Sequence, residues 1–211
     1  LDHKGYASSV TLMENLTSLN YTATVIRNLS DRWRVMGLMT PGIASDLEGS
    51  IDQDDFTFQA VAILVRTYSP KLQVGYGIAW ANTFGQPFPL PVLSADWNNG
   101  GRLRVSTILP AKLELWFAAT QRSDYGMEFN IGGNQYHLDP EIYGVGNPLL
   151  KYSAMTLGPS VSHRFSEAIA VKAHGGVSFG RRFEYADGED ELADYGMESA
   201  AFAMVKLEVV P

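Results

Sequence analysis

The side chains best suited to acid–base chemistry in this sequence are four histidines, His3, His137, His163 and His174. No two of them stand two or four residues apart, the spacings at which a pair can bind a metal from one face of a strand or helix. Ser162 and Ser166 flank His163, but neighbouring strand residues point to opposite faces, and no nucleophile-elbow motif surrounds them. The sequence therefore predicts no catalytic residue, no metal site and no cofactor.

Charged side chains form a second group, because they alternate with large apolar residues in extended segments. Such alternation places the charges on one face of a sheet, together with many glycines and alanines. Seven residues are expected to line a narrow interior: Arg102, Arg104, Lys112, Glu114, Arg164, Lys172 and His174. Their expected role is to pair across that interior or to filter small ions.

Acidic residues cluster in two long links, 46–55 and 187–194. Neither cluster has the ligand spacing and central glycine of an EF-hand. A solvated loop is the expected structure for both. Weak binding of divalent cations near lipopolysaccharide phosphates is the functional alternative.

Extended segments with a period of two residues run from end to end and must position these side chains. The clearest is 168–181, and others are 57–66, 74–81, 102–109, 112–120, 154–165 and 197–209, with weaker candidates at 6–13, 20–29, 33–40, 127–131 and 135–138. The links between them are short at 28–32, 68–71, 109–112 and 165–168, and long at 42–55, 83–101, 139–148 and 183–195. Alternation of short and long links is typical of transmembrane β-barrels.

The segment Val74–Ala81 raises the main structural question. Val74, Tyr76, Ile78 and Trp80 are large and apolar, whereas only glycine and alanine stand between them. A water-facing strand would carry lysine, glutamate or threonine on its second face. We therefore expect the large face to contact lipid and the small face to line a tight lumen. In 57–66 the same rule assigns Val61, Ile63 and Val65 to the large face, and Ala60 and Ala62 to the lumen.

Composition agrees with this assignment. The chain has 211 residues, of which 45% are hydrophobic and 18% charged, no cysteine, and a net charge of −7. The charged fraction is below the roughly 25% that is usual for soluble domains. The acidic balance disfavours nucleic-acid binding, and the lack of cysteine excludes disulfides and thiolate metal sites. A soluble lipocalin-like barrel, with its large residues inside, remains the competing fold.

The glycine-rich run 75–78, the pair Phe84-Gly85, the proline-rich stretch 87–91 and Leu109-Pro110 together resemble a group of uncharacterised bacterial outer-membrane β-barrel proteins. The likeness extends over residues 21–206. It implies a location and a fold, and it carries no catalytic residues.

The sequence thus predicts an all-β protein: residues 1–211 as a single closed antiparallel transmembrane β-barrel of about 12 strands, with 10 as the alternative, short periplasmic turns and longer outer loops. The expected location is the bacterial outer membrane, with the lipid bilayer and lipopolysaccharide as partners, other outer-membrane proteins as further candidates, and no nucleic acid. We expect a narrow or plugged lumen that serves a small-solute channel or a structural or accessory component, not an enzyme. The alternatives are a soluble lipocalin-like binder of small molecules and an outer-membrane lipid-modifying enzyme.

Overall fold

The computed structural model describes residues 17–45, 51, 55–81, 88–138, 146–188 and 190–209. All regular structure in this part is β-strand, which confirms the all-β class. Its thirteen strands are β1 (Thr17–Asn20), β2 (Ala23–Asn28), β3 (Trp33–Ser45), β4 (Phe56–Ser69), β5 (Leu72–Ala81), β6 (Phe88–Asn98), β7 (Leu103–Leu109), β8 (Lys112–Ala118), β9 (Ser123–His137), β10 (Pro148–Arg164), β11 (Ile169–Asp187), β12 (Asp190–Met197) and β13 (Ala200–Val209). No helix in the described part is long and apolar enough to cross a bilayer.

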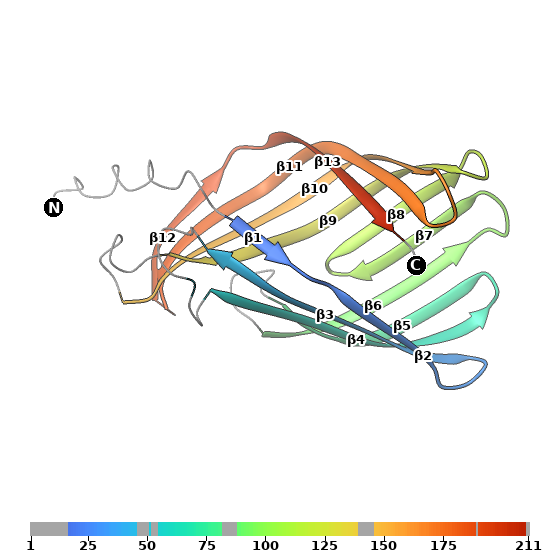
Figure 1. The fold of residues 1–211 in the computed structure, drawn as a ribbon, viewed down its shortest axis with the longest axis horizontal. Coiled ribbons are helices and arrows are strands. Elements are labelled where there is room, and N and C mark those ends of the chain that lie inside the picture. Colours follow the sequence, from blue (N-terminus) through green and yellow to red (C-terminus); the bar gives the residue numbers. More distant parts are fainter. Residues whose placement is uncertain are drawn as a thin grey trace.

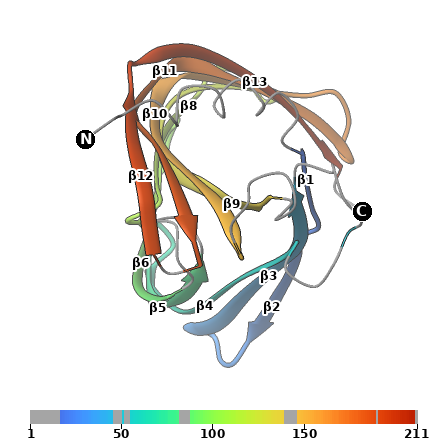
Figure 2. The same ribbon diagram turned by 90° about the vertical axis from the view of Figure 1, so that its left-hand side faces the viewer.

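The strands form one sheet in which chain neighbours from β3 to β12 pair antiparallel (Figure 1). At one edge β1 and β2 both pair with β3, and at the other β12 and β13 both pair with β11. A parallel bridge between Ser45 and His137 joins β3 to β9 and closes seven strands into a barrel, to which six further strands are attached. Viewed from the end opposite the tightest turns, β9 curves across the interior toward β3 (Figure 2).

The described residues form thirteen strands, so the expected count of about 12, or 10, is not confirmed. Two successive strands share each edge of the sheet, β1 and β2 on β3, and β12 and β13 on β11. The candidate segment 6–13 lies outside the described residues, as do His3, residues 46–50 and 52–54 of the first acidic link, and Phe84, Gly85 and Pro87.

Tight turns at one end of the sheet share a side-chain signature. The hydroxyl of Ser30 accepts a hydrogen bond from the backbone N–H of Trp33 at 3.2 Å, and that of Thr120 accepts one from Ser123 at 2.9 Å. Ser69, Asn99 and Ser166 bond their following backbone N–H groups in the same way. These local bonds satisfy the backbone where the ladder ends, which fixes short turns at this end.

The large side chains of β5 point outward, as expected. Tyr76, Ile78 and Trp80 are 47%, 54% and 45% exposed, whereas Ala79 and Ala81 are buried. The same outward face continues around the sheet on Leu93, Leu109, Leu113, Leu115, Phe117, Tyr125, Met127, Leu157, Val161, Ile169 and Val177, each of which is exposed.

The orientation predicted for β4 is wrong. Ile63 and Val65 are buried inside, where they form an apolar cluster with Ala79 and Val92, whereas Ala62 is exposed on the outside. The register explains this reversal, because Ile63 lies opposite Gly77 and Val65 opposite Gly75. Large β4 side chains fill the space that the β5 glycines leave empty.

Two of the predicted long links are also wrong. Link 83–101 contains β6, and link 183–195 contains the end of β11 and most of β12. In β6, Pro89 and Pro91 pair with β5, but β7 covers β6 only from Leu93 onward. Proline lacks an N–H donor and is tolerated where one edge of a strand has no partner.

Candidate functional site: the polar interior

Three strands place an ionic cluster inside the sheet. Lys172 of β11 lies with its Nζ 2.9 Å from Glu114 Oε1 of β8 and 2.9 Å from Glu128 Oε1 of β9. Lys112 Nζ lies 2.8 Å from the same oxygen of Glu114. The Lys172 ammonium also stands 4.9 Å from the ring of Trp116. Two cations and two anions thus balance in one group.

Burial makes this balance necessary. Glu128 is 3% exposed and Glu114 is 9% exposed, and they lie directly opposite one another in the ladder between β8 and β9. Two neighbouring carboxylates repel, and an unpaired buried charge is strongly destabilising. Lys172 therefore neutralises a pair of like charges and spans the interior from β11 to β8.

A buried serine–histidine pair lies on the next strands. Ser160 Oγ of β10 is 2.7 Å from Nδ1 of His174 on β11, and both residues are almost fully buried. The Nε2 atom of His174 has no hydrogen-bond partner within the described residues. The centres of the His174 and Phe202 rings are 4.8 Å apart. An acyl-transfer triad needs an accessible serine, whereas Ser160 is 2% exposed.

The remaining predicted lumen residues lie elsewhere. Arg104 pairs with Asp124 at 3.4 Å near the short turns. These two residues and Arg164 line a depression of about 220 Å³. Arg102 is exposed just before β7 begins. The structure thus brings together Lys112, Glu114 and Lys172, places His174 in a separate pair, and leaves the three arginines at the end of the barrel.

Sequence reasoning missed Glu128, Trp116 and Ser160 as interior polar partners. The alternation of Met127-Glu128-Phe129 carried the signal for Glu128, since its neighbours are large and apolar. Ser160 gave no such signal, because only the register with His174 reveals its partner.

A second polar group lies at the end of β9 that is away from the short turns. His137 Nε2 lies 2.8 Å from Asn147 Oδ1, and its Nδ1 lies 3.9 Å from Asp55 Oδ1. The backbone N–H of Asn147 donates to Asp187 Oδ1 at 2.8 Å. Several apolar residues next to it in the sequence or the ladder are buried: Ala44, Leu138, Leu149, Leu150 and Ala186. The end of β9 is thereby fixed against β3, where the Ser45–His137 bridge forms.

Strands β10 and β11 are long, with 17 and 19 residues. A tilted strand needs about 9–11 residues to cross a bilayer, whereas β11 has 19. In the last third of β11, Arg182 Nε donates to Asp194 Oδ1 of β12 at 2.7 Å, and Nη2 contacts Oδ2. The hydrogen bond from Arg182 lowers the pKa of the Asp194 carboxyl, and the carboxylate in turn raises the pKa of the guanidinium.

Among the described residues, no group of three or more histidines and carboxylates is arranged to hold a metal ion. A comparison with curated proteins finds no match to this chain, and a comparison with solved structures finds none either. A family described as a domain of unknown function (DUF6268) matches residues 1–199. The chain therefore belongs to the DUF6268 family.

Proposed function

We propose that this protein is a bacterial outer-membrane β-barrel whose lumen is closed by its own side chains, and that it serves as a structural or accessory membrane component. The observation that carries the proposal is the reversed polarity of the sheet. Exposed Ile78, Leu115 and Val177 stand outside, whereas Glu114, Glu128 and His174 are buried inside. In water this arrangement would be unfavourable, because apolar area would stay hydrated while charges are desolvated.

The size of the apolar exterior supports the same proposal. Exposed large apolar side chains occur on the outer face of consecutive strands from β4 to β11. Soluble monomers rarely expose apolar patches larger than about 300–600 Å². A soluble lipocalin-like barrel would instead bury its large residues, so this alternative is disfavoured. A lipid-modifying enzyme is disfavoured because Ser160, the serine beside His174, is inaccessible.

Membrane insertion places a condition on the two edges of the sheet, since lipid cannot hydrogen-bond an open strand edge. Within the described residues, no pairing joins β1 or β2 to β12 or β13. The antiparallel order makes both edges run in the same direction (Figure 1). In a membrane, both edges therefore need partners for their backbone hydrogen-bonding groups.

The interior supports a plugged lumen rather than a wide pore. Apolar side chains from β4, β5 and β6 pack together in the interior, the Lys172 cluster joins β8, β9 and β11, and the buried His137 group lies near one end. A small-solute channel is the second candidate, and the Lys172 cluster favours it because paired charges can rearrange around an ion. Planar-bilayer conductance separates the two: we expect no stable conductance steps, and regular small steps would favour the channel.

Tryptophan fluorescence tests the membrane proposal. Trp80 points outward and is 45% exposed, whereas Trp116 points inward and is 6% exposed. We would prepare variants that keep only one of these tryptophans, replace the others by phenylalanine, and refold them into vesicles of brominated phosphatidylcholine. Bromine quenches on contact, so Trp80 should be strongly quenched and Trp116 weakly. Equal weak quenching of both residues in protein that has folded would overturn the proposal.

A further inference from the structure

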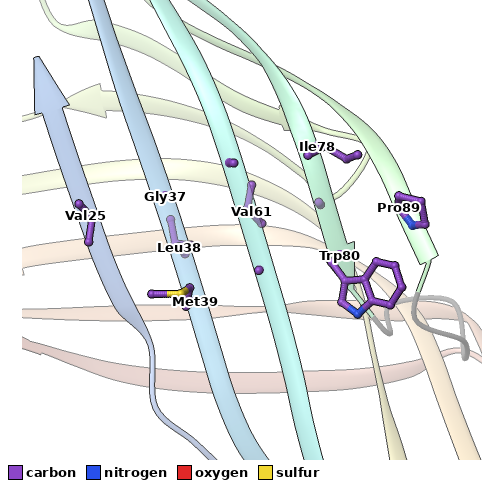
Figure 3. Close-up of a pocket in the computed structure, with 11 residues that line it drawn as sticks. Val25, Gly37, Leu38, Met39, Val61, Ile78, Trp80 and Pro89 are labelled. Atoms are coloured by element: carbon purple, nitrogen blue, oxygen red, sulfur yellow. The ribbon is translucent and has the colours of Figure 1, made fainter. Parts of the chain in front are cut away.

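An apolar depression of about 440 Å³ lies on the outer face over strands β2 to β6 (Figure 3). Its floor consists of the small residues Gly37, Ala60 and Ala62, and Ile78 and Trp80 form one wall. The opposite wall is made by Val25 and Met39. The volume falls within the roughly 300–1,000 Å³ that is usual for small-molecule sites.

Lack of space does not explain why Gly37, a residue of the floor, is small. A Cβ atom built at Gly37 would meet only the backbone oxygen of Val61, at 4.0 Å. At Gly77, two strands away on β5, a Cβ would instead lie 1.9 Å from a backbone oxygen. A larger side chain would therefore fit at Gly37, and the depression is open space.

A cation stands on the same face, toward the short turns. The guanidinium of Arg66 lies 4.9 Å from the ring of Tyr68 and 5.4 Å from that of Trp33, and Trp33 packs edge-on against Tyr76. Arg66 forms no ion pair with a carboxylate in the described part of the chain. An arginine held between aromatic rings at a membrane interface presents its N–H donors to anionic oxygens.

The distance from Arg66 to the apolar depression matches the distance from the headgroup of a phospholipid to its acyl chains. Arg66 lies on the same strand, β4, as two residues of the floor. Ala62 is four residues from it and Ala60 is six. At about 3.4 Å per residue, this is about 14–20 Å along the strand. A tilt of about 45° reduces it to roughly 10–14 Å along the membrane normal, within one leaflet of about 15 Å.

We propose that this face binds one phospholipid, with its phosphate at Arg66 and an acyl chain in the depression over Gly37, Ala60 and Ala62. The depression contains no polar side chain, which suits a hydrocarbon chain. Arg66 supplies the complementary charge for the headgroup. This inference depends on the proposed membrane location and adds a defined lipid site to it.

The test uses folded protein in mild detergent, titrated with phosphatidylglycerol that is brominated near the ends of its acyl chains. In the variant that keeps only Trp80, quenching should saturate at one lipid per protein. Ala62→Leu should weaken binding about tenfold, the effect of losing contact with roughly two methylene groups. Gly37→Leu should act in the same way, and Arg66→Gln should weaken binding about tenfold through the phosphate.

The matched control is Ala173→Leu, at an exposed outward alanine on β11, which should bind lipid as the parent does. Each variant would first be shown to fold by its heat-dependent mobility on a denaturing gel. Quenching that fails to saturate, or equal binding by folded Ala62→Leu and Gly37→Leu, would overturn the lipid site. The membrane proposal would survive that outcome if Trp80 is still quenched in brominated vesicles, and would fail only if it is not.

Discussion

Removing Lys172, one of the two cations of the interior cluster, is the most informative perturbation of this barrel. In Lys172→Met, Glu128 loses the ammonium 2.9 Å away, whereas Glu114 keeps Lys112 at 2.8 Å. Breaking a buried ion pair by removing one partner costs about 3–5 kcal/mol. Because one of the two carboxylates keeps a cation, we expect the lower end, a loss of about 3 kcal/mol in the free energy of unfolding.

Urea titration of the refolded protein in detergent, followed by tryptophan fluorescence, measures this loss by linear extrapolation. The double variant Lys172→Met/Glu128→Gln should recover about 1–2 kcal/mol, because the neutral amide leaves no unpaired charge. Lys71→Met, on an exposed turn, serves as the control and should change stability by less than about 0.5 kcal/mol. A loss below about 1 kcal/mol for Lys172→Met, or further destabilisation by Glu128→Gln, would refute the argument from buried charge.

Gly158→Ala should cost about 1–3 kcal/mol, because its Cβ would lie 2.0 Å from a backbone oxygen of β11, whereas Gly132→Ala, with no atom within 4 Å, should be near neutral in the same urea titration. Ser160→Ala should cost about 1–3 kcal/mol by leaving its buried histidine partner without the hydroxyl, and an unchanged unfolding midpoint would contradict this. The pKa of Asp194 is lowered in the folded protein, so the ionised carboxylate stabilises the fold fully above its unfolded pKa of about 3.9, and this stabilisation is lost as the pH falls through the folded pKa. The difference in unfolding free energy between the parent and Asp194→Asn should therefore vanish in acid. A difference that persists at pH 2 would contradict the pairing.

The sequence by itself determined the class of this fold. Alternation of large and small residues in Val74–Ala81 predicted both the strand and its outward apolar face, and the structure exposes Tyr76, Ile78 and Trp80 as expected. Period-two patterning is a local property of the chain, so it can be recognised without knowing the neighbours of a strand. The same patterning predicted that Lys112, Glu114 and Lys172 share an inner face.

Only the tertiary structure decided which face of β4 is inside. Val61, Ile63 and Val65 have the same alternation as the outward residues of β5, yet Ile63 and Val65 are buried because they lie opposite Gly77 and Gly75. The pairing of Lys172 with Glu128 and of Ser160 with His174 likewise joins residues on different strands. Alternation fixes two faces but not their direction, because the space available on each side of a strand is set by the register and side-chain volume of its neighbours.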